Sequence, residues 1–312
     1  MHRHNFPSPL RYPGGKAALA NFIKLVLKEN NLVDGHYVEV YAGGAGIAWP
    51  LLFEEYVRFV SINDISKSVC SFWKAVLQDT EDLCKLIHDT PISTEEWLRQ
   101  RVVQSNPNDF SPLDLGFSTF FLNRTNRSGI LRGGIIGGKS QNGKWKIDAR
   151  FNKEELIHRI QRIALYSSRI KLYELDACDF IDTVLPGLPS KALVYFDPPY
   201  YKKGSELYEN HYSHKDHVKL ARRIRNRVNN PWIVSYDFCP EIASIYRKSR
   251  NVRYDLNYSA QERYAGPEIM YFSENIIIPS KSEFDQPDSN EFLVNFVNPV
   301  GIQRIDLLTP IL

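Results

Sequence analysis

The sequence has few cysteines and no long apolar segment. The four cysteines include no C-x-x-C pair, which argues against a disulfide framework and against a zinc site; they are Cys70, Cys84, Cys178 and Cys239. No apolar run approaches the roughly 18 to 20 residues of a membrane span, and no apolar signal segment follows the first residues. We therefore expect a cytoplasmic protein with reduced thiols, no membrane span and no metal.

Charge of one sign is also scarce. The 39 Lys and Arg residues and 36 Asp and Glu residues give a formal net charge of +3, which is too small to identify a nucleic-acid partner by itself. The hydrophobic share of 43% and the charged share of 24% are those of an ordinary soluble globular protein. A chain of 312 residues suffices for one α/β domain with a large insertion, or for two modest domains.

Short apolar or β-branched runs, each followed by a turn and a helical pattern, recur along the chain. This βα rhythm predicts a mostly parallel sheet. The runs are residues 36–40, 57–62, 170–173 and 192–196, with a further run at 232–235. Two later β-like runs, 252–258 and 269–278, predict an antiparallel hairpin that closes the sheet edge.

The interval 79–165 differs from the rest of the chain in composition and pattern. It has a helical pattern around residues 94–103 and then becomes glycine-rich and basic. We therefore expect an inserted domain at 79–165, with 1–78 and 166–279 forming the main α/β domain. The tail, 280–312, has no assigned role.

The sharpest motif is Asp197-Pro198-Pro199-Tyr200, directly after the apolar run 193–196. It should stand at the carboxyl end of a central strand, where open α/β sheets bind ligands. The prolines stiffen the turn, which offers carbonyl oxygens rather than N–H donors. Because the amino nitrogen of a base is nucleophilic only as it becomes pyramidal, we assign Asp197 and the carbonyl of Pro198 as acceptors for its hydrogens, and Tyr200 as a stacking platform. A purely structural turn is the alternative.

Three weaker motifs precede it. The turn Glu39-Val40-Tyr41-Ala42-Gly43-Gly44-Ala45-Gly46 leads into a helix near Ile47 and would let a ligand approach backbone N–H groups. Asn63-Asp64 follows at a spacing where an acid commonly bonds ribose hydroxyls, although it could equally cap a helix. Arg11-Tyr12-Pro13-Gly14-Gly15-Lys16 places a lysine ahead of a helical stretch, residues 17–28, where it could approach the carboxylate of a cofactor.

Together, in this order, the four motifs resemble the Dam-like D12 class of N6-adenine DNA methyltransferases. The resemblance includes residues 120–125, 208–212 and 234–237 and extends to about Pro279. It implies a Rossmann-like class I sheet dependent on S-adenosylmethionine, with an inserted, mainly helical and β-hairpin target-recognition domain at 79–165. It also implies a site-specific enzyme that methylates N6 of an adenine flipped out of double-stranded DNA, and a monomer.

The resemblance assigns roles to residues. Asp197, Pro198, Pro199 and Tyr200 match the catalytic loop of the family. The candidate cofactor-binding residues are Tyr12, Lys16, Glu39, Tyr41, Gly43, Gly44, Gly46, Asp64, Asp179 and Asp197. The family often has tryptophan where this chain has Tyr12 and phenylalanine where it has Tyr41, but neither difference removes a catalytic group.

Residues 121–150 contain seven Lys or Arg, one acidic residue and six glycines, a composition that suits a loop or hairpin tracking DNA phosphates. The predicted contacts are Arg124, Arg127, Arg132 and Lys139, with Asn123 and Asn126 as base readers. The stretch 200–204 could hold the extruded nucleotide. A solvated basic hairpin is the alternative reading.

Other functions remain open. Methylation of RNA adenine or of a protein glutamine amide uses a similar nucleophile, but such relatives commonly carry N-P-P-Y and lack this basic insertion. A catalytically silent DNA-binding homologue is the non-enzymatic alternative. The sequence also leaves open whether the enzyme stands alone or serves a restriction, phage or defence system. The spacing of His211, His214 and His217 suggests metal, but no further ligand completes a set.

Overall fold

A computed structural model describes residues 7–11, 16–201, 212–256, 267–279 and 294–297. Eight strands in this part of the chain form one sheet, in the order β3-β2-β1-β4-β5-β7-β6-β8. Their bounds are β1 (Gly35–Glu39), β2 (Val57–Asn63), β3 (Ile170–Tyr173), β4 (Ala192–Phe196), β5 (Trp232–Asp237), β6 (Arg250–Leu256), β7 (Glu268–Phe272) and β8 (Val294–Val297).

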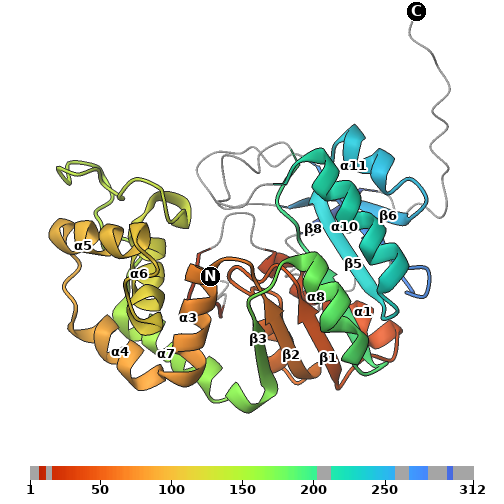
Figure 1. Ribbon diagram of the computed structural model, residues 1–312, viewed down its shortest axis with the longest axis horizontal. Coiled ribbons are helices and arrows are strands. Elements are labelled where there is room, and N and C mark those ends of the chain that lie inside the picture. The colour runs from red at the N-terminus through yellow and green to blue at the C-terminus, as the bar shows by residue number, and fades with distance from the viewer. Residues whose placement is uncertain (1–6, 12–15, 202–211, 257–266, 280–293, 298–312) are drawn as a thin grey trace, which may run out of the picture.

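Helices cover both faces of the sheet (Figure 1). One face carries α1 (Ala20–Glu29), α2 (Ala48–Phe53) and α3 (Lys67–Gln78), preceded by the 3-10 turn η1 (Ala17–Leu19). The other face carries α8 (Ala177–Thr183), α10 (His214–Arg227) and α11 (Pro240–Ile245). The described residues also contain the short 3-10 turns η2 (Arg127–Gly129), η3 (Ser167–Arg169) and η4 (Leu185–Gly187).

The central strands are buried on both faces because each face has its own helical layer. Along β4, Leu193 and Tyr195 belong to one hydrophobic core, whereas Val194 and Phe196 belong to the other. This alternation follows from the two-residue period of a strand. It also explains the continuous apolar run in the sequence, which is typical of a parallel strand covered on both sides.

The parallel half of the sheet brings four strand ends together. Glu39 at the end of β1 is paired with Ile62 on β2 and with Tyr195 on β4, and Asn63 is paired with Tyr173 on β3. The residues that follow these strands therefore lie along one edge of the sheet, where a doubly wound fold binds its ligands.

The antiparallel half confirms the predicted pairing of β6 with β7. However, the second strand of the hairpin, β7, is the one that pairs with β5, and the hairpin does not form the edge of the sheet. Strand β8, from the tail 280–312, pairs with β6 and forms the last strand of the sheet. Because β7 runs opposite to β5, its first residue lies beside the carboxyl end of β5.

The interval 79–165 contains four helices to one side of the sheet, next to α3 (Figure 1). They are α4 (Thr80–Asp89), α5 (Thr94–Ser105), α6 (Pro112–Thr125) and α7 (Lys153–Ala164). The stacked rings of Phe72 on α3 and Phe120 on α6 join these helices to the core beside the sheet. Instead of the expected β-hairpin, the interval has one antiparallel bridge, between Asn126 and Ile135.

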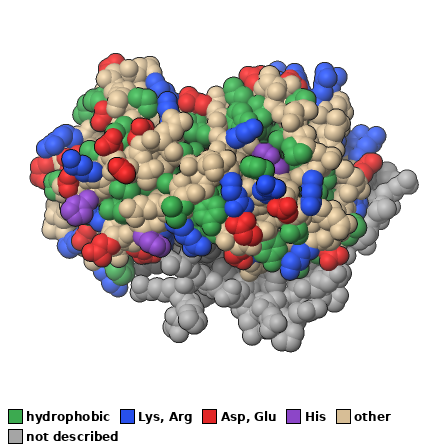
Figure 2. All heavy atoms as spheres, turned by 90° about the horizontal axis from the view of Figure 1, so that it is seen from below, with side chains coloured by type: hydrophobic (Ala, Val, Ile, Leu, Met, Phe, Trp, Pro, Cys, Tyr) green, Lys and Arg blue, Asp and Glu red, His purple; other side chains and the backbone are tan. Residues whose placement is uncertain are grey.

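The surface charges are mixed in sign over the face drawn in Figure 2, where Lys and Arg side chains alternate with Asp and Glu. Within the described residues, no helix is both long and apolar enough to span a bilayer. In the same part of the chain, no cluster of three or more His, Cys, Asp or Glu side chains has a metal-binding arrangement.

Candidate active site

The loop after β4 lies at the carboxyl edge of the parallel strands. Strand β4 ends at Phe196, so Asp197 is the first residue beyond it, and the two prolines that follow fix the backbone. Pro198 is buried, whereas the side chain of Asp197 keeps 21% of its surface exposed. The loop therefore combines a fixed backbone with a carboxylate that a ligand can reach.

Two neighbours hold the carboxylate of Asp197. The hydroxyl of Ser235 donates to Oδ1 at 2.8 Å, and Nζ of Lys16 lies 3.5 Å from the same oxygen. No described residue hydrogen-bonds to Oδ2. Burial raises the pKa of Asp197 to about 6; Lys16 and Ser235 lower it, and the charge of Glu268 adds to the rise. The group is thus a carboxylate at neutral pH, with one oxygen available to a ligand.

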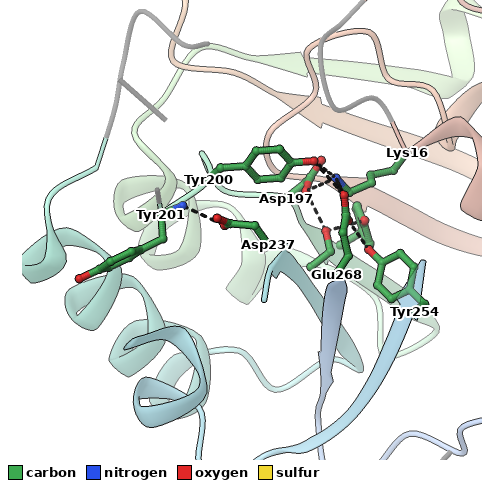
Figure 3. A network of polar contacts seen from close by, with 9 residues as sticks. Lys16, Asp197, Tyr200, Tyr201, Asp237, Tyr254 and Glu268 are labelled. Carbon is green, nitrogen blue, oxygen red and sulfur yellow. Dashed lines mark hydrogen bonds and ion pairs between the residues drawn. The ribbon is translucent and has the colours of Figure 1, made fainter. Parts of the chain in front are cut away.

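Lys16 lies at the centre of the polar cluster shown in Figure 3. Its Nζ lies 3.2 Å from Oε2 of Glu268 and donates to the hydroxyl of Tyr200 at 2.9 Å. The same ammonium group lies 4.9 Å from the centre of the Tyr200 ring. Lys16 therefore contacts both the catalytic loop and β7. The sequence did not reveal that this lysine lies beside Asp197.

The sequence patterns do not point to Glu268 and Tyr254, which complete this cluster. Glu268 is 4% exposed and accepts hydrogen bonds from the hydroxyls of Tyr200 at 2.9 Å and Tyr254 at 2.7 Å. It is the first residue of the antiparallel strand β7 and is paired with Asp237 at the end of β5. The only sequence signal for Glu268 was an acidic residue at the start of an apolar run. That signal does not indicate at which edge of the sheet the residue lies.

The turn between β1 and α2 is tied to the neighbouring strand. Gly43 has a φ of 45°, which glycine adopts at no steric cost, and its N–H donates to Oδ2 of Asp64 at 2.9 Å. The carbonyl of Gly44 accepts from the indole of Trp49 at 3.2 Å, and Gly46 lies against the start of η1. These contacts fix the conformation of the turn at the carboxyl ends of β1 and β2.

Two buried carboxylates flank this turn. Oε2 of Glu39 accepts from the N–H of Ala48, the first residue of α2, at 3.3 Å, and Oδ1 of Asp64 accepts from Ser66 at 2.9 Å. Burial raises the pKa of Glu39 well above its ordinary value, and the charge of Asp197 raises it further. Burial also raises the pKa of Asp64, although backbone N–H groups oppose this. Such acids favour a ligand that brings hydroxyl groups or a positive charge.

The remaining cofactor candidates are placed differently from one another. The hydroxyl of Tyr41 lies 3.0 Å from that of Tyr212. Asp179 is exposed in the first turn of α8, whereas Asp176 caps that helix by accepting from its second residue at 2.9 Å. Asp176 therefore follows β3 more closely than Asp179 does. Tyr12 lies outside the described residues.

Comparison with known proteins identifies the family. A family model for D12 class N6 adenine-specific DNA methyltransferases matches residues 12–260. The chain belongs to this family. A relative, the type II methyltransferase M.MjaIII of Methanocaldococcus jannaschii, is 25% identical over 205 residues, which are 61% of this chain and 68% of the relative.

Solved structures resemble this D12-class chain more distantly. The rRNA methyltransferase aviRa of Streptomyces viridochromogenes is 12% identical, with a TM-score of 0.35 over 84% of this chain and 86% of that chain. A protein of Legionella pneumophila is also 12% identical, with a TM-score of 0.34 over 95% and 97%. These scores are low, so the strand order carries the assignment: five parallel strands, followed across the sheet by three antiparallel strands. The expected Rossmann-like class I methyltransferase fold is confirmed.

Three of the six predicted DNA contacts of this methyltransferase lie in its interior. Asn123, Arg124 and Asn126 are 2%, 7% and 0% exposed. Arg124 donates from Nε to the carbonyl of Pro9 at 2.7 Å, and burial lowers its pKa to about 9. Asn126 accepts from the indole of Trp97 at 2.6 Å, and Asn123 binds the backbone of the N-terminal segment. Because their polar groups are used inside the protein, these side chains are structural, which corrects the prediction that they contact DNA.

The other three predicted contacts are exposed. Three exposed cations, Arg127, Arg132 and Lys139, lie on the segment between α6 and α7. They are at the surface of the helical lobe, residues 79–165. Their placement is compatible with binding to a phosphate backbone, because a long cationic side chain at the surface can contact a phosphate without a large desolvation cost.

Proposed function

We propose that this chain transfers a methyl group from S-adenosylmethionine to N6 of an adenine in double-stranded DNA. The observation that carries the proposal is the carboxylate of Asp197, held through Oδ1 at the carboxyl edge of the sheet, with 21% of its side chain exposed. Membership of the D12 class supports DNA as the substrate and adenine as the base. The methyl donor and the extrusion of the base are our inference.

The two acceptors suit the chemistry of an amino group. The lone pair of adenine N6 is delocalised into the ring and becomes nucleophilic only as the nitrogen turns pyramidal. Oδ2 of Asp197 and the carbonyl of Pro198 would accept its two hydrogens, from a loop that the prolines make stiff. Both acceptors bind more strongly as positive charge develops on the nitrogen, so they stabilise the transition state more than the ground state.

Tyr200 is placed to act as the platform for the base. Its hydroxyl is held between Lys16 and Glu268, so the orientation of the ring is fixed before a ligand arrives. The residue is partly exposed, and stacking of a base on such a ring contributes about 1 to 3 kcal/mol. An adenine flipped out of the duplex at a cost of a few kcal/mol could thus be held beside Asp197.

The residues around the glycine turn fit S-adenosylmethionine. The carboxylates of Glu39, Asp64 and Asp176 follow β1, β2 and β3 along one edge, beside the left-handed turn at Gly43. In this proposal Asp64 accepts from ribose hydroxyls, and the acidic edge attracts the positive charges of the donor. When bound, S-adenosylmethionine supplies a methyl group on a positively charged sulfur.

The pH dependence of the reaction follows from Asp197. Only the ionised carboxylate offers Oδ2 as an acceptor without a competing proton. Since its pKa is raised to about 6, the rate should be nearly constant above neutral pH and should fall as the pH drops through 6.

The exposed cations of the helical lobe support DNA as the substrate. Arg127, Arg132 and Lys139 would contact phosphates and position the duplex, whereas recognition of the bases requires other groups. The M. jannaschii relative is named a type II methyltransferase, and by that likeness we propose that this enzyme modifies a defined sequence.

The direct test uses purified protein, S-adenosylmethionine labelled on its methyl group and unmethylated duplex DNA. The DNA is digested to nucleosides, and the labelled nucleoside is identified by mass spectrometry. Asp197→Ala should abolish the product, whereas Glu81→Ala, at an exposed acid on α4, should not. Single-stranded RNA and a glutamine-containing peptide are assayed in parallel.

Labelled N6-methyladenine that is absent in the Asp197 variant would establish the reaction and its catalytic loop together. Transfer to RNA or peptide but not to DNA would refute the proposed substrate. Cofactor binding without any transfer would indicate a catalytically silent homologue.

A further inference from the structure

Glu268 is a buried carboxylate whose two oxygens have different hydroxyl partners and share one cation. Oε1 accepts from the hydroxyl of Tyr200 at 2.9 Å and lies 3.4 Å from Nζ of Lys16. Oε2 accepts from the hydroxyl of Tyr254 at 2.7 Å and lies 3.2 Å from the same ammonium group. A buried carboxylate without partners would cost several kcal/mol, and these three neighbours offset part of that cost.

The position of Lys16 is the informative feature. Its ammonium group is nearer to Glu268, at 3.2 Å, than to Asp197, at 3.5 Å. An unopposed lysine beside a carboxylate normally closes to about 2.7 to 2.9 Å and occupies the oxygen that it meets. Glu268 therefore competes with Asp197 for the same cation.

We propose that Glu268 is a positioning residue, which holds Lys16 away from close contact with Asp197 and fixes the hydroxyl of Tyr200. The inference rests on the proposed methyl transfer, because it assigns Asp197 the role of acceptor for the amino group of the substrate. With Glu268 in place, the lysine attracts the carboxylate without capturing it, and Oδ2 stays available. Glu268 touches none of the reacting atoms in this scheme.

Other groups also act on Asp197. The groups that act on it directly are Lys16, Tyr37, Glu39, Tyr195, Ser235 and Glu268. Tyr200 and Tyr254 contact Lys16 and Glu268 instead. Among them Lys16 is the cation, and Glu39 and Glu268 are the carboxylates. Removing the charge of Glu268 acts twice in one direction, because a repelling carboxylate is lost and the lysine is released towards Asp197.

The test compares Glu268→Gln with Glu268→Asp in the full-length protein. Gln nearly preserves the shape and can accept from Tyr200 or Tyr254, but it carries no charge. We expect kcat on duplex DNA to fall about tenfold or more, with KM for DNA changed less than about threefold, because the loss is one of transition-state interaction. The acid limb of kcat/KM should move to lower pH by about 0.5 or more, since the pKa of Asp197 falls. Asp keeps the charge and should restore the limb at least in part.

Two matched variants serve as controls for the pH shift, one expected to move the acid limb in the opposite direction and one expected to leave it unchanged. Ser235→Ala removes a hydrogen bond to the ionised form of Asp197, so its acid limb should move the opposite way, to higher pH. Tyr254→Phe removes one hydroxyl from Glu268 but keeps the charge, so its limb should stay near that of the wild type.

A second readout does not depend on activity. The carboxyl carbon of Asp197 is followed by 13C NMR against pH in the protein without ligands, with Asp197→Asn as the assignment control. A lower midpoint in Glu268→Gln than in the wild type supports the inference, and a higher midpoint in Ser235→Ala is the control that the signal reports shifts of either sign.

Equal midpoints and a loss of rate that is uniform in pH would overturn the inference and make Glu268 merely structural. If Glu268→Gln does not fold, Glu268→Asp still decides it: the shorter side chain withdraws the carboxylate from Lys16 and should lower the midpoint by a smaller amount, whereas an unchanged midpoint would overturn the inference. A wild type that fails to methylate any substrate would refute the proposed function instead, and the NMR midpoints would still report on Glu268.

Discussion

Replacing the catalytic carboxylate should make the protein more stable at neutral pH. Burial is the largest influence on Asp197 and raises its pKa from 3.8 to about 6, despite the attraction of Lys16. The ionised form is thus disfavoured in the folded protein relative to the unfolded chain. Each pKa unit corresponds to about 1.4 kcal/mol, so the charge destabilises the fold by about 3 kcal/mol at pH 8. Asp197→Asn keeps the shape, can still accept from Ser235 and removes this cost.

The gain should depend on pH in a defined direction. An acid with a raised pKa binds its proton more tightly in the folded state, so its favourable contribution is complete below about pH 4 and is lost as the pH rises through 6. The advantage of Asp197→Asn should therefore be about 3 kcal/mol at pH 8 and about half of that at pH 5. For a chain of this size, 1 kcal/mol corresponds to about 2 °C in Tm, so the expected difference is about 6 °C at pH 8 and about 3 °C at pH 5.

Thermal unfolding of both proteins, followed by circular dichroism between pH 5 and pH 8, measures this difference. Asp179→Asn is the matched control, because that carboxylate is exposed and its replacement should change stability by less than about 0.5 kcal/mol. A variant Asp197→Asn that is less stable than the wild type at pH 8 would refute the reasoning. It would mean that the pair with Lys16 stabilises the fold by more than burial of the carboxylate destabilises it.

Further predictions concern the helical lobe. Asn126→Ala should lower the free energy of unfolding by about 2 to 3 kcal/mol in urea denaturation, because buried backbone and indole groups lose their partner. Gly129→Ala should destabilise by more than about 1 kcal/mol in the same assay, since the residue has a φ of +77° and an added Cβ would lie 2.2 Å from the carbonyl oxygen of Arg11. Arg127→Ala and Lys139→Ala should each reduce the slope of log affinity for DNA against log salt by about 0.9, whereas an unchanged slope would exclude a phosphate contact there.

The parallel half of the sheet could be predicted from the sequence because its signals are local. Each of the strands β1 to β4 is a short run that leads into its own turn and helix, and β1 and β4 are buried along their whole length. The place of β7 between β5 and β6 could not, since it depends on pairing between distant segments whose turn residues do not specify the neighbour. The strand β8 is only four residues long and gave no usable pattern.

The candidate site divides in the same way. Asp197 and the glycine turn stand in contiguous motifs at strand ends, so their position follows from the fold class. Glu268 reaches the same edge only because an antiparallel strand begins there. Arg124 was misjudged from local composition, because α6 is buried on every side from Leu115 to Thr125 and leaves no exposed face for a cation there. Composition describes a segment as basic, but the packing of α6 against its neighbours decides that this cation lies inside.

The site and the segment 121–150 carry charges of opposite sign, which explains why the net charge of +3 is uninformative. The edge of the sheet gathers several carboxylates around one described cation, Lys16, and burial raises the pKa of Glu39, Asp64 and Asp197. Such an edge favours a cation and repels phosphate, so attraction of a duplex must come from exposed cations elsewhere, as at Arg127. Salt should therefore act mainly on binding through the lobe, and pH mainly on the rate through the pocket, because bulk ions screen exposed charges far more than buried ones.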